Sequence, residues 1–397
     1  MSVYAIATMD TKGAEIAYVA RCLVAAGVTV KMVDVGTYGD PTVPPDIRRQ
    51  DVLGERELPS SNDRGEAVTG MSLALADFLS NEARHGRVDG VLGIGGSGGT
   101  AIITAAMRAL PIGLPKLMVS TVASGNTEPY VDCYDITMMY SVVDIAGLNV
   151  VSQKVLANAA HAIAGMVTHR SRAEDAKPCL GMTMFGVTTP CVTTVRETLE
   201  GRGYDCLVFH ATGTGGRAME SLVQSGMIRG VLDITTTEVA DEVVGGVLSA
   251  GPTRLDALVA AEIPLVLSVG AVDMVNFGAI DTVPAPFRAR NLHVHNAHVT
   301  LMRTTRDENI QIAQWIAAKL NCSQAPWTVV LPEGGVSALD MPGAPFHDPD
   351  ANQALFETLE SDSHLSDCRR IIRSPLHIND PDFAAEVVGE YLKLAAD

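Results

Sequence analysis

One stretch decides the fold of this chain: Gly90-Val91-Leu92-Gly93-Ile94-Gly95-Gly96-Ser97-Gly98-Gly99-Thr100. Its first half is a short apolar run typical of a buried strand, and its second half is almost entirely glycine. Residues 100–108 then have the pattern of a helix. A strand, a glycine-rich turn and a helix in succession direct free backbone N–H groups at one point, where they bind anions. The stretch therefore predicts a phosphate-binding turn.

Around this stretch, apolar runs typical of strands alternate with amphipathic runs typical of helices. Strands are expected at residues 4–8, 28–35 and 116–120, and helices at 14–26, 67–85 and 151–170. Residues 37–65 are rich in Pro, Gly, Asp and Arg and predict a long loop. Loops of this length within a compact domain are usually functional or mobile.

The second half of the chain repeats this order. Residues 229–238 resemble 89–96, and residues 263–270 resemble 114–121. A polar segment, residues 171–178, ends in proline and predicts a linker. We therefore expect an α/β protein of two doubly wound, Rossmann-like lobes with parallel sheets, related by duplication. The expected domains are a nucleotide-binding lobe (1–170), the linker (171–178) and a second α/β lobe (179–397).

The composition narrows the functional class. The 397 residues are 47% hydrophobic and carry a formal net charge of −17, which argues against a nucleic-acid partner. No apolar run is long enough to cross a membrane, and the first residues lack a signal-peptide pattern. Seven scattered cysteines without a C-x-x-C pair are typical of a reducing compartment. A cytoplasmic protein is expected.

Three known glycine motifs fit the stretch in part. Residues 93–98 match the dinucleotide fingerprint, but residues 112–116 lack the carboxylate that should come after it. In the Walker A pattern, Gly99 stands where the phosphate-binding lysine belongs. Lys12, at the end of the first expected strand, is the natural substitute. Its alternative is a solvated lysine at a helix start.

The stretch also fits the nucleophile elbow of serine hydrolases, with Ser97 at its centre. Asp233 and His293 or His295 would complete the triad in the required order. No H-G-G-G oxyanion segment is present, and the elbow does not need so many glycines. The hydrolase is therefore an alternative to the phosphate-binding turn.

The second lobe carries polar groups at the expected carboxyl ends of its strands, where ligands bind in open parallel sheets. Residues 210–217 predict a second anion-binding turn, with a tight turn as the alternative. His293 and His295 could bind a metal from one face of a strand. The candidates for contact with a second, small-molecule ligand are Thr188, Thr189, His210, Thr212, Gly213, Gly215, Gly216, Thr236, Thr237, Asp273 and Asn276.

Several long motifs carry a resemblance to a known family. They occupy residues 94–100, 119–125, 183–191, 232–241, 267–278 and 301–305. Together they resemble the ATP-binding family typified by the N-terminal domain of the tomato mosaic virus resistance protein, whose bacterial members form an uncharacterised protein family. The resemblance implies ATP with Mg²⁺ as cofactors and a homodimer.

The matching motifs and the strand-end rule name the nucleotide contacts. They are Asp10, Thr11, Lys12, Asp34, Gly36, Gly95, Gly96, Ser97, Gly98, Gly99, Thr100, Thr121, Ala123, Ser124 and Gly125. Lys12 is expected to neutralise phosphate charge, and Asp233 or Glu238 to hold Mg²⁺ or act as a base. An ATP-dependent enzyme acting on a small molecule is the first functional hypothesis. The alternative is an ATP-gated binding protein without turnover.

Overall fold

The computed structural model describes residues 1–58, 63–170 and 177–396. The chain divides into two compact units, Met1–Glu174 (unit 1) and Asp175–Asp397 (unit 2). Residues 171–176 of the expected linker lie outside the described residues. Within the described part, none of the helices combines the length and the apolar character needed to cross a membrane.

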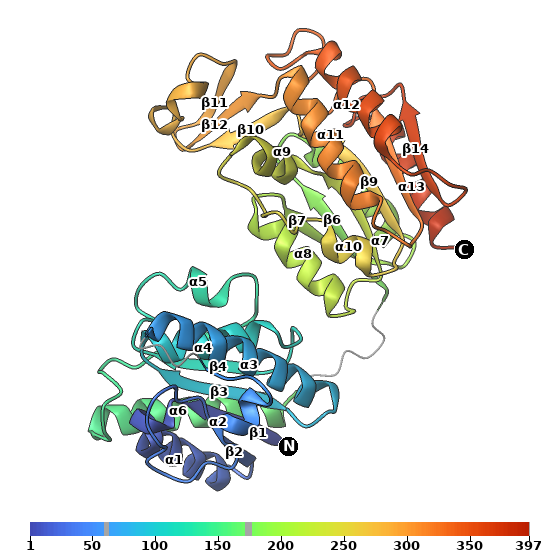
Figure 1. Cartoon of the computed structure of the whole chain (residues 1–397). Coiled ribbons are helices and arrows are strands. Elements are labelled where there is room, and N and C mark those ends of the chain that lie inside the picture. Colours follow the sequence, from blue (N-terminus) through green and yellow to red (C-terminus); the bar gives the residue numbers. More distant parts are fainter. Residues whose placement is uncertain (59–62, 171–176, 397) are drawn as a thin grey trace. The chain divides into compact units, whose positions relative to one another are not determined.

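Unit 1 is built on a five-stranded parallel sheet (Figure 1). Its strands, in spatial order, are β2 (Thr29–Asp34), β1 (Ser2–Ala7), β3 (Gly90–Gly95), β4 (Lys116–Ser120) and β5 (Thr137–Tyr140). Helices α1 (Met9–Ala25) and α6 (Val150–Thr168) pack on one face. Helices α3 (Arg64–Arg84) and α4 (Ser97–Arg108) pack on the other. Two short helices, α2 (Arg49–Leu53) and α5 (Glu128–Val131), complete the unit.

This strand order places a topological switch point between β1 and β3. The chain moves from β1 to β2 on one side, and from β3 to β4 on the other. The loops that leave the carboxyl ends of these two strands therefore diverge, and ligands of doubly wound folds bind in the crevice between them. The glycine turn comes directly after β3 at this point.

Unit 2 repeats the same order in a six-stranded parallel sheet. Its strands are β14 (Arg369–Ser374), β13 (Trp327–Pro332), β9 (Leu265–Gly270), β8 (Gly230–Thr235), β6 (Cys179–Met184) and β7 (Asp205–His210). The run β7-β6-β8-β9-β13 corresponds to β2-β1-β3-β4-β5 of unit 1. The structure confirms the predicted fold class, two doubly wound lobes with parallel sheets.

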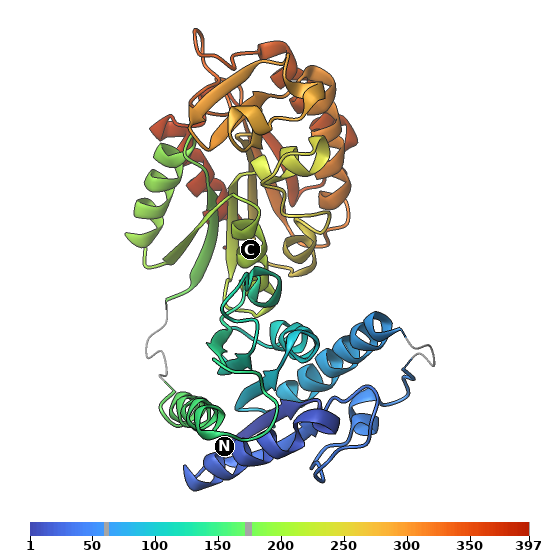
Figure 2. The ribbon, with the colours of Figure 1, turned by 90° about the vertical axis from the view of Figure 1, so that its left-hand side faces the viewer.

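Helices cover both faces of the second sheet (Figure 2). Helices α7 (Thr189–Glu200) and α13 (Pro381–Leu394) pack on one face. The other face carries α8 (Thr214–Gln224), α9 (Thr237–Val244), α10 (Asp256–Ala260), α11 (Arg306–Leu320) and α12 (Pro349–Asp362).

A small antiparallel sheet is inserted after β9; of its three strands, the sequence predicts only the one that carries His293 and His295. Its strands are β10 (Met274–Phe277), β12 (Val299–Arg303) and β11 (Leu292–Asn296), in that spatial order. Two short 3-10 helices, η1 (Ile280–Thr282) and η2 (Ala285–Phe287), lie between β10 and β11. The insertion separates β9 from α11, so the repeat is interrupted here.

Candidate functional site

The glycine turn of unit 1 has the local structure that its sequence predicts. Strand β3 ends at Gly95, Gly96 is the N-cap of α4, and the helix begins at Ser97, three residues earlier than expected. A Cβ on Gly95 would lie 3.0 Å from backbone atoms of Gly99, so any larger residue would force the backbone of this turn to shift. The backbone N–H of Thr100 donates to the carbonyl of Gly96 at 2.8 Å. The N–H groups of Ser97, Gly98 and Gly99, which come before Thr100 in the first turn of α4, have no acceptors within the helix.

A cavity of about 540 Å³ lies beside this turn. It is lined by Thr8, Asp10, Thr11, Lys12, Thr37, Tyr38, Arg64, Val68, Gly96, Ser97, Gly98, Gly99 and Ile102. The residues come from the ends of β1 and β3, the loop after β2 and the helices α1, α3 and α4, so the cavity occupies the switch point. Seven of the predicted nucleotide contacts line it together: Asp10, Thr11, Lys12, Gly96, Ser97, Gly98 and Gly99.

Two residues with cationic side chains, Lys12 and Arg64, line this cavity. Lys12 has non-helical backbone angles (φ −128°) near the start of α1, and its ammonium donates to the carbonyl of Ile145 at 2.6 Å. Arg64 is the first residue of α3, and its guanidinium lies 3.5 Å from the point where a Cβ on Gly98 would sit. Neither has a carboxylate partner among the described residues, although the chain carries a net charge of −17. The lining therefore carries two cations and one carboxylate, that of Asp10.

Two predicted contacts, Asp34 and Gly36, do not line the cavity, but they bond to each other, and Asp34 bonds to the start of α1. The carboxylate of Asp34 is 1% exposed and accepts the N–H groups of Met9 at 3.0 Å and Gly36 at 2.8 Å. It thereby ties the start of α1 to the loop after β2. Asp10 lies against this loop as well, 3.3 Å from the point where a Cβ on Gly36 would sit.

The remaining predicted contacts of unit 1 lie outside the cavity lining. The hydroxyl of Thr100 is fully buried and pairs with that of Ser120 at 2.6 Å, which joins α4 to β4. Gly95 lies beneath the turn. The others occupy the turn after β4, with Thr121 3.7 Å from the Cβ position of Gly96: Thr121, Ala123, Ser124 and Gly125.

A second cavity in unit 1, of about 600 Å³, lies at the amino ends of β4 and β5, opposite the carboxyl ends where the switch point lies. Lys116, the first residue of β4, lines it with a fully buried side chain. Its ammonium bonds to the carboxylate of Asp135 and the carbonyl of Pro111, both at 2.7 Å. The charge of Lys116 is therefore neutralised by the chain itself, unlike the charges at the switch point.

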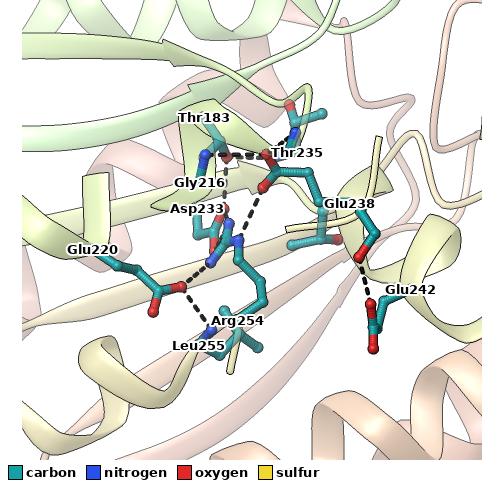
Figure 3. Close-up of polar contacts among 12 residues, drawn as sticks. Thr183, Gly216, Glu220, Asp233, Thr235, Glu238, Glu242, Arg254 and Leu255 are labelled. Atoms are coloured by element: carbon teal, nitrogen blue, oxygen red, sulfur yellow. Dashed lines mark hydrogen bonds and ion pairs between the residues drawn. The ribbon is translucent and has the colours of Figure 1, made fainter. Parts of the chain in front are cut away.

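In unit 2, the predicted metal and base candidates Asp233 and Glu238 belong to a buried ion cluster (Figure 3). The guanidinium of Arg254 bonds to both oxygens of Asp233 at 2.8 and 2.9 Å, to Glu238 at 2.9 Å and to Glu220 at 2.9 Å. Thr183 donates a further bond to Asp233 at 2.6 Å. Burial raises the pKa of Asp233 and of Glu220, and the Arg254 charge opposes that rise.

In the turn at residues 210–217, predicted to bind an anion of a second ligand, backbone N–H groups bond instead to a carboxylate of the chain itself, that of Glu238. The N–H groups of Gly213 and Gly216 donate to its carboxylate at 2.7 and 3.0 Å. The other oxygen of Glu238 pairs with Arg254. A ligand in this turn would have to displace an ion-paired carboxylate, and Mg²⁺ at Asp233 and Glu238 would have to compete with Arg254. Gly215 lies in the same turn, where a Cβ would meet the carbonyl of His210.

Most other second-ligand candidates of unit 2 are buried and bonded within the protein. The hydroxyls of Thr188 and Thr235 pair at 2.7 Å, and Thr236 donates to the carbonyl of Ser268 at 3.1 Å. The amide of Asn276 donates to Thr237 and to Asp241, both at 3.1 Å. Asp273 accepts from Ser337 at 2.7 Å.

The exposed candidates of unit 2 lie near the ends of β6 and β7. Thr189 begins α7, and Thr212 is half-buried. The ring of His210 stacks on that of Phe185, with centroids 5.4 Å apart. These side chains stay accessible to a ligand.

The two alternatives drawn from histidines lack support in the geometry. His293 and His295 lie on β11, but the described residues contain no group of three or more His, Cys, Asp or Glu side chains suited to a metal ion. In the hydrolase alternative, Asp233 would orient a histidine. Its carboxylate instead bonds to Arg254 and Thr183.

Comparison with known proteins gives the family. Residues 1–172 match the N-terminal domain, and residues 177–395 the C-terminal domain, of Uncharacterised protein family UPF0261. The chain belongs to this family. A UPF0261 protein of Rhizobium meliloti is 54% identical over 99% of both chains, and one of Mesorhizobium japonicum is 50% identical over 99% of both. The ToMV resistance protein Tm-1(GCR237) of Solanum lycopersicum is 47% identical over 99% of this chain and 56% of its own length.

The two UPF0261 domains coincide closely with the two units. All residues that line the switch-point cavity belong to the N-terminal UPF0261 domain, and the Arg254 cluster belongs to the C-terminal domain. The resemblance to the tomato protein extends over both domains.

Tyr38, Arg64, Val68 and Ile102 line the cavity but were not among the predicted contacts. Arg64 is the important omission, because it adds a second cation. The sequence pattern predicts a helix from residue 67, whereas α3 begins at Arg64. Asp63 is the signal that could have found it, since it caps α3 by accepting the N–H groups of Gly65 and Glu66 at 2.7 and 3.3 Å.

Proposed function

We propose that unit 1 binds ATP, or a closely related nucleoside polyphosphate, in the switch-point cavity. One observation carries the proposal: the first turn of α4 and the cations Lys12 and Arg64 converge on one cavity of a strongly acidic chain. Phosphate oxygens are the ligands that backbone N–H groups at a helix N-terminus and a guanidinium bind best. The family resemblance supports ATP in particular.

An ATP-dependent reaction on a small molecule bound by unit 2 is the enzymatic form of this proposal. Thr189, Thr212 and the ring of His210 support it as accessible groups near the strand ends. The alternative is that ATP gates the binding of another ligand without turnover. The resemblance further supports a homodimer, which sedimentation equilibrium tests.

Isothermal titration calorimetry with ATP, ADP, AMP, NAD and inorganic phosphate, each with Mg²⁺, tests the binding proposal. ATP should bind more tightly than AMP and NAD, because added phosphates meet the two cations and the helix N-terminus. Equal affinity for ATP and AMP, or tighter binding of NAD, would refute it. Incubation with Mg-ATP and a metabolite pool, followed by measurement of ADP, AMP and phosphate, separates the enzyme from the gated binding protein.

A further inference from the structure

A carboxylate stands in the cavity that otherwise concentrates positive charge. Asp10 lies near the start of α1 and lines the cavity beside Lys12 and opposite the glycine turn. A phosphate chain bound at the first turn of α4 would bring further negative charge close to it. The position of Asp10 in the first turn of α1 suits the helix dipole. Phosphate oxygens in the same cavity would nevertheless repel its carboxylate unless a cation lay between them.

Among the described residues, no side-chain cation forms an ion pair with Asp10. Its carboxylate accepts the N–H of Gly39 and the hydroxyl of Thr11, both at 3.4 Å, which is long for a hydrogen bond. Asp34, its acidic neighbour across Gly36, instead accepts two backbone N–H groups at 3.0 and 2.8 Å and is buried. Asp34 therefore has a structural role, whereas Asp10 lines the cavity and makes only these two long bonds among the described residues.

We propose that Asp10 is the protein ligand of the divalent cation that accompanies the phosphates. Mg²⁺ in nucleotide sites is held by one or two carboxylates together with phosphate oxygens and water, and one carboxylate facing a phosphate-binding turn meets that requirement. The hydroxyls of Thr8 and Thr11, 3.2 Å apart, lie on the same side of the cavity and can bond to the coordinated water. This inference rests on the proposed binding of ATP in unit 1.

The assignment places the metal in unit 1 rather than at Asp233 and Glu238. Those two carboxylates already share the charge of Arg254, and Glu238 also accepts two backbone N–H groups. Asp10 has no cation within ion-pair distance among the described residues. It is therefore the stronger metal candidate.

Asp10→Asn tests the proposal, because the amide keeps the shape and an oxygen that can accept the bond from Gly39. Asp40→Asn is the matched control. Asp40 lies in the loop after β2, is 99% exposed, pairs at 3.6 Å with Arg49 and does not line the cavity. Both variants remove one negative charge. Titration calorimetry measures ATP affinity for each protein with Mg²⁺ and, separately, with EDTA.

The wild type and Asp40→Asn should bind ATP about tenfold or more tightly with Mg²⁺ than with EDTA, as expected for one contact to a charged group. Asp10→Asn should lose this preference and bind metal-free ATP at least as tightly as the wild type, because the repulsion is gone. As a second readout, Mn²⁺ with ATP should give a protein-bound electron paramagnetic resonance signal in the wild type and not in Asp10→Asn.

The outcomes separate the two proposals. Absence of ATP binding by the wild type in both buffers refutes the proposed function itself. ATP binding without a Mg²⁺ preference, or a preference that Asp10→Asn retains, refutes only the role of Asp10. Thermal unfolding of each variant shows that a lost preference does not come from misfolding.

Discussion

At the scale of single residues, Arg64 distinguishes the cavity from an ordinary glycine turn. A helix N-terminus alone attracts an anion with modest energy, whereas a guanidinium at the same point adds a full charge and paired donors. The position of Arg64 at the start of α3 brings it across the cavity from α4, although the two lie in separate segments of the sequence. Sequence patterns describe each segment and do not report such a contact.

Arg64→Ala should weaken ATP binding by about 1.5–3 kcal/mol, the usual contribution of a hydrogen bond to a charged group. Arg56→Ala is the control, because Arg56 is half-exposed, pairs with Asp77 and lies outside the cavity lining. Calorimetric titration of both variants checks the prediction. Equal losses of affinity in the two variants would mean that only the overall charge matters.

At the scale of elements, the glycines of the turn between β3 and α4 differ in how much space each leaves for a side chain. A Cβ on Gly95 would meet the backbone of Gly99 at 3.0 Å, and backbone cannot move aside cheaply. A Cβ on Gly98 would meet only the guanidinium of Arg64 at 3.5 Å and a methyl of Val68 at 3.9 Å, which are ordinary contacts.

Gly95→Ala should therefore lower the free energy of unfolding by about 1–3 kcal/mol, the usual cost of an overpacked site. Gly98→Ala should unfold within about 1 kcal/mol of the wild type, since helix α4 accepts alanine at its second residue. Chemical denaturation measures both. A Gly98→Ala protein that is the less stable of the two would contradict the geometry of the turn.

Most strands of the two parallel sheets could be predicted from the sequence because they are short, predominantly apolar runs, such as β3 and β9. The strands β10 and β12 could not, since neither contains a long alternating pattern. They form by pairing across about twenty-five residues, with Asn276 opposite Leu301. The Arg254 cluster could not be predicted for a similar reason. The polar residues Asp233 and Glu238 indicate a ligand site, whereas their partner Arg254 lies on a later loop.

Arg254→Met should destabilise the chain by about 3–5 kcal/mol at neutral pH, because three buried carboxylates would lose their counter-ion. Lys319→Met is the control, since Lys319 forms an ion pair with the half-exposed Asp256, and such pairs contribute about 0–1 kcal/mol. Denaturation in urea compares the two. Equal stability of both variants would show that the cluster adds little to the fold.

At the scale of the whole molecule, the two units share a strand order and differ in the side chains at the carboxyl ends of their strands. Unit 1 leaves a cavity at its switch point, with two cations that lack carboxylate partners among the described residues. Unit 2 fills its strand ends with bonded hydroxyls and the Arg254 cluster. The same topology therefore carries an open cavity in unit 1 and a buried polar network in unit 2, whose accessible candidates lie near His210.

This difference predicts two separate influences on thermal unfolding. Mg-ATP at one hundred times its dissociation constant should stabilise unit 1 by about 2.7 kcal/mol. Unit 2 should respond to pH, because burial raises the pKa of Asp241 and of Asp273 to about 7 from an ordinary value of 3.8. Between these values the folded unit binds protons that the unfolded chain has released. Its stability should therefore fall as pH rises from about 4 to 7, and level off above 7.

Differential scanning calorimetry of the full chain at pH 5 and pH 7.5, with and without Mg-ATP, measures both influences. Asp273→Asn should reduce the pH dependence, since the amide cannot ionise and can still accept the bond from Ser337. Arg64→Ala should reduce the response to ATP and leave the pH dependence unchanged. If Asp273→Asn abolished the response to ATP, or if Arg64→Ala abolished the pH dependence, the division of roles between the units would be wrong. Because the two variants lie in different UPF0261 domains, each serves as the other's control.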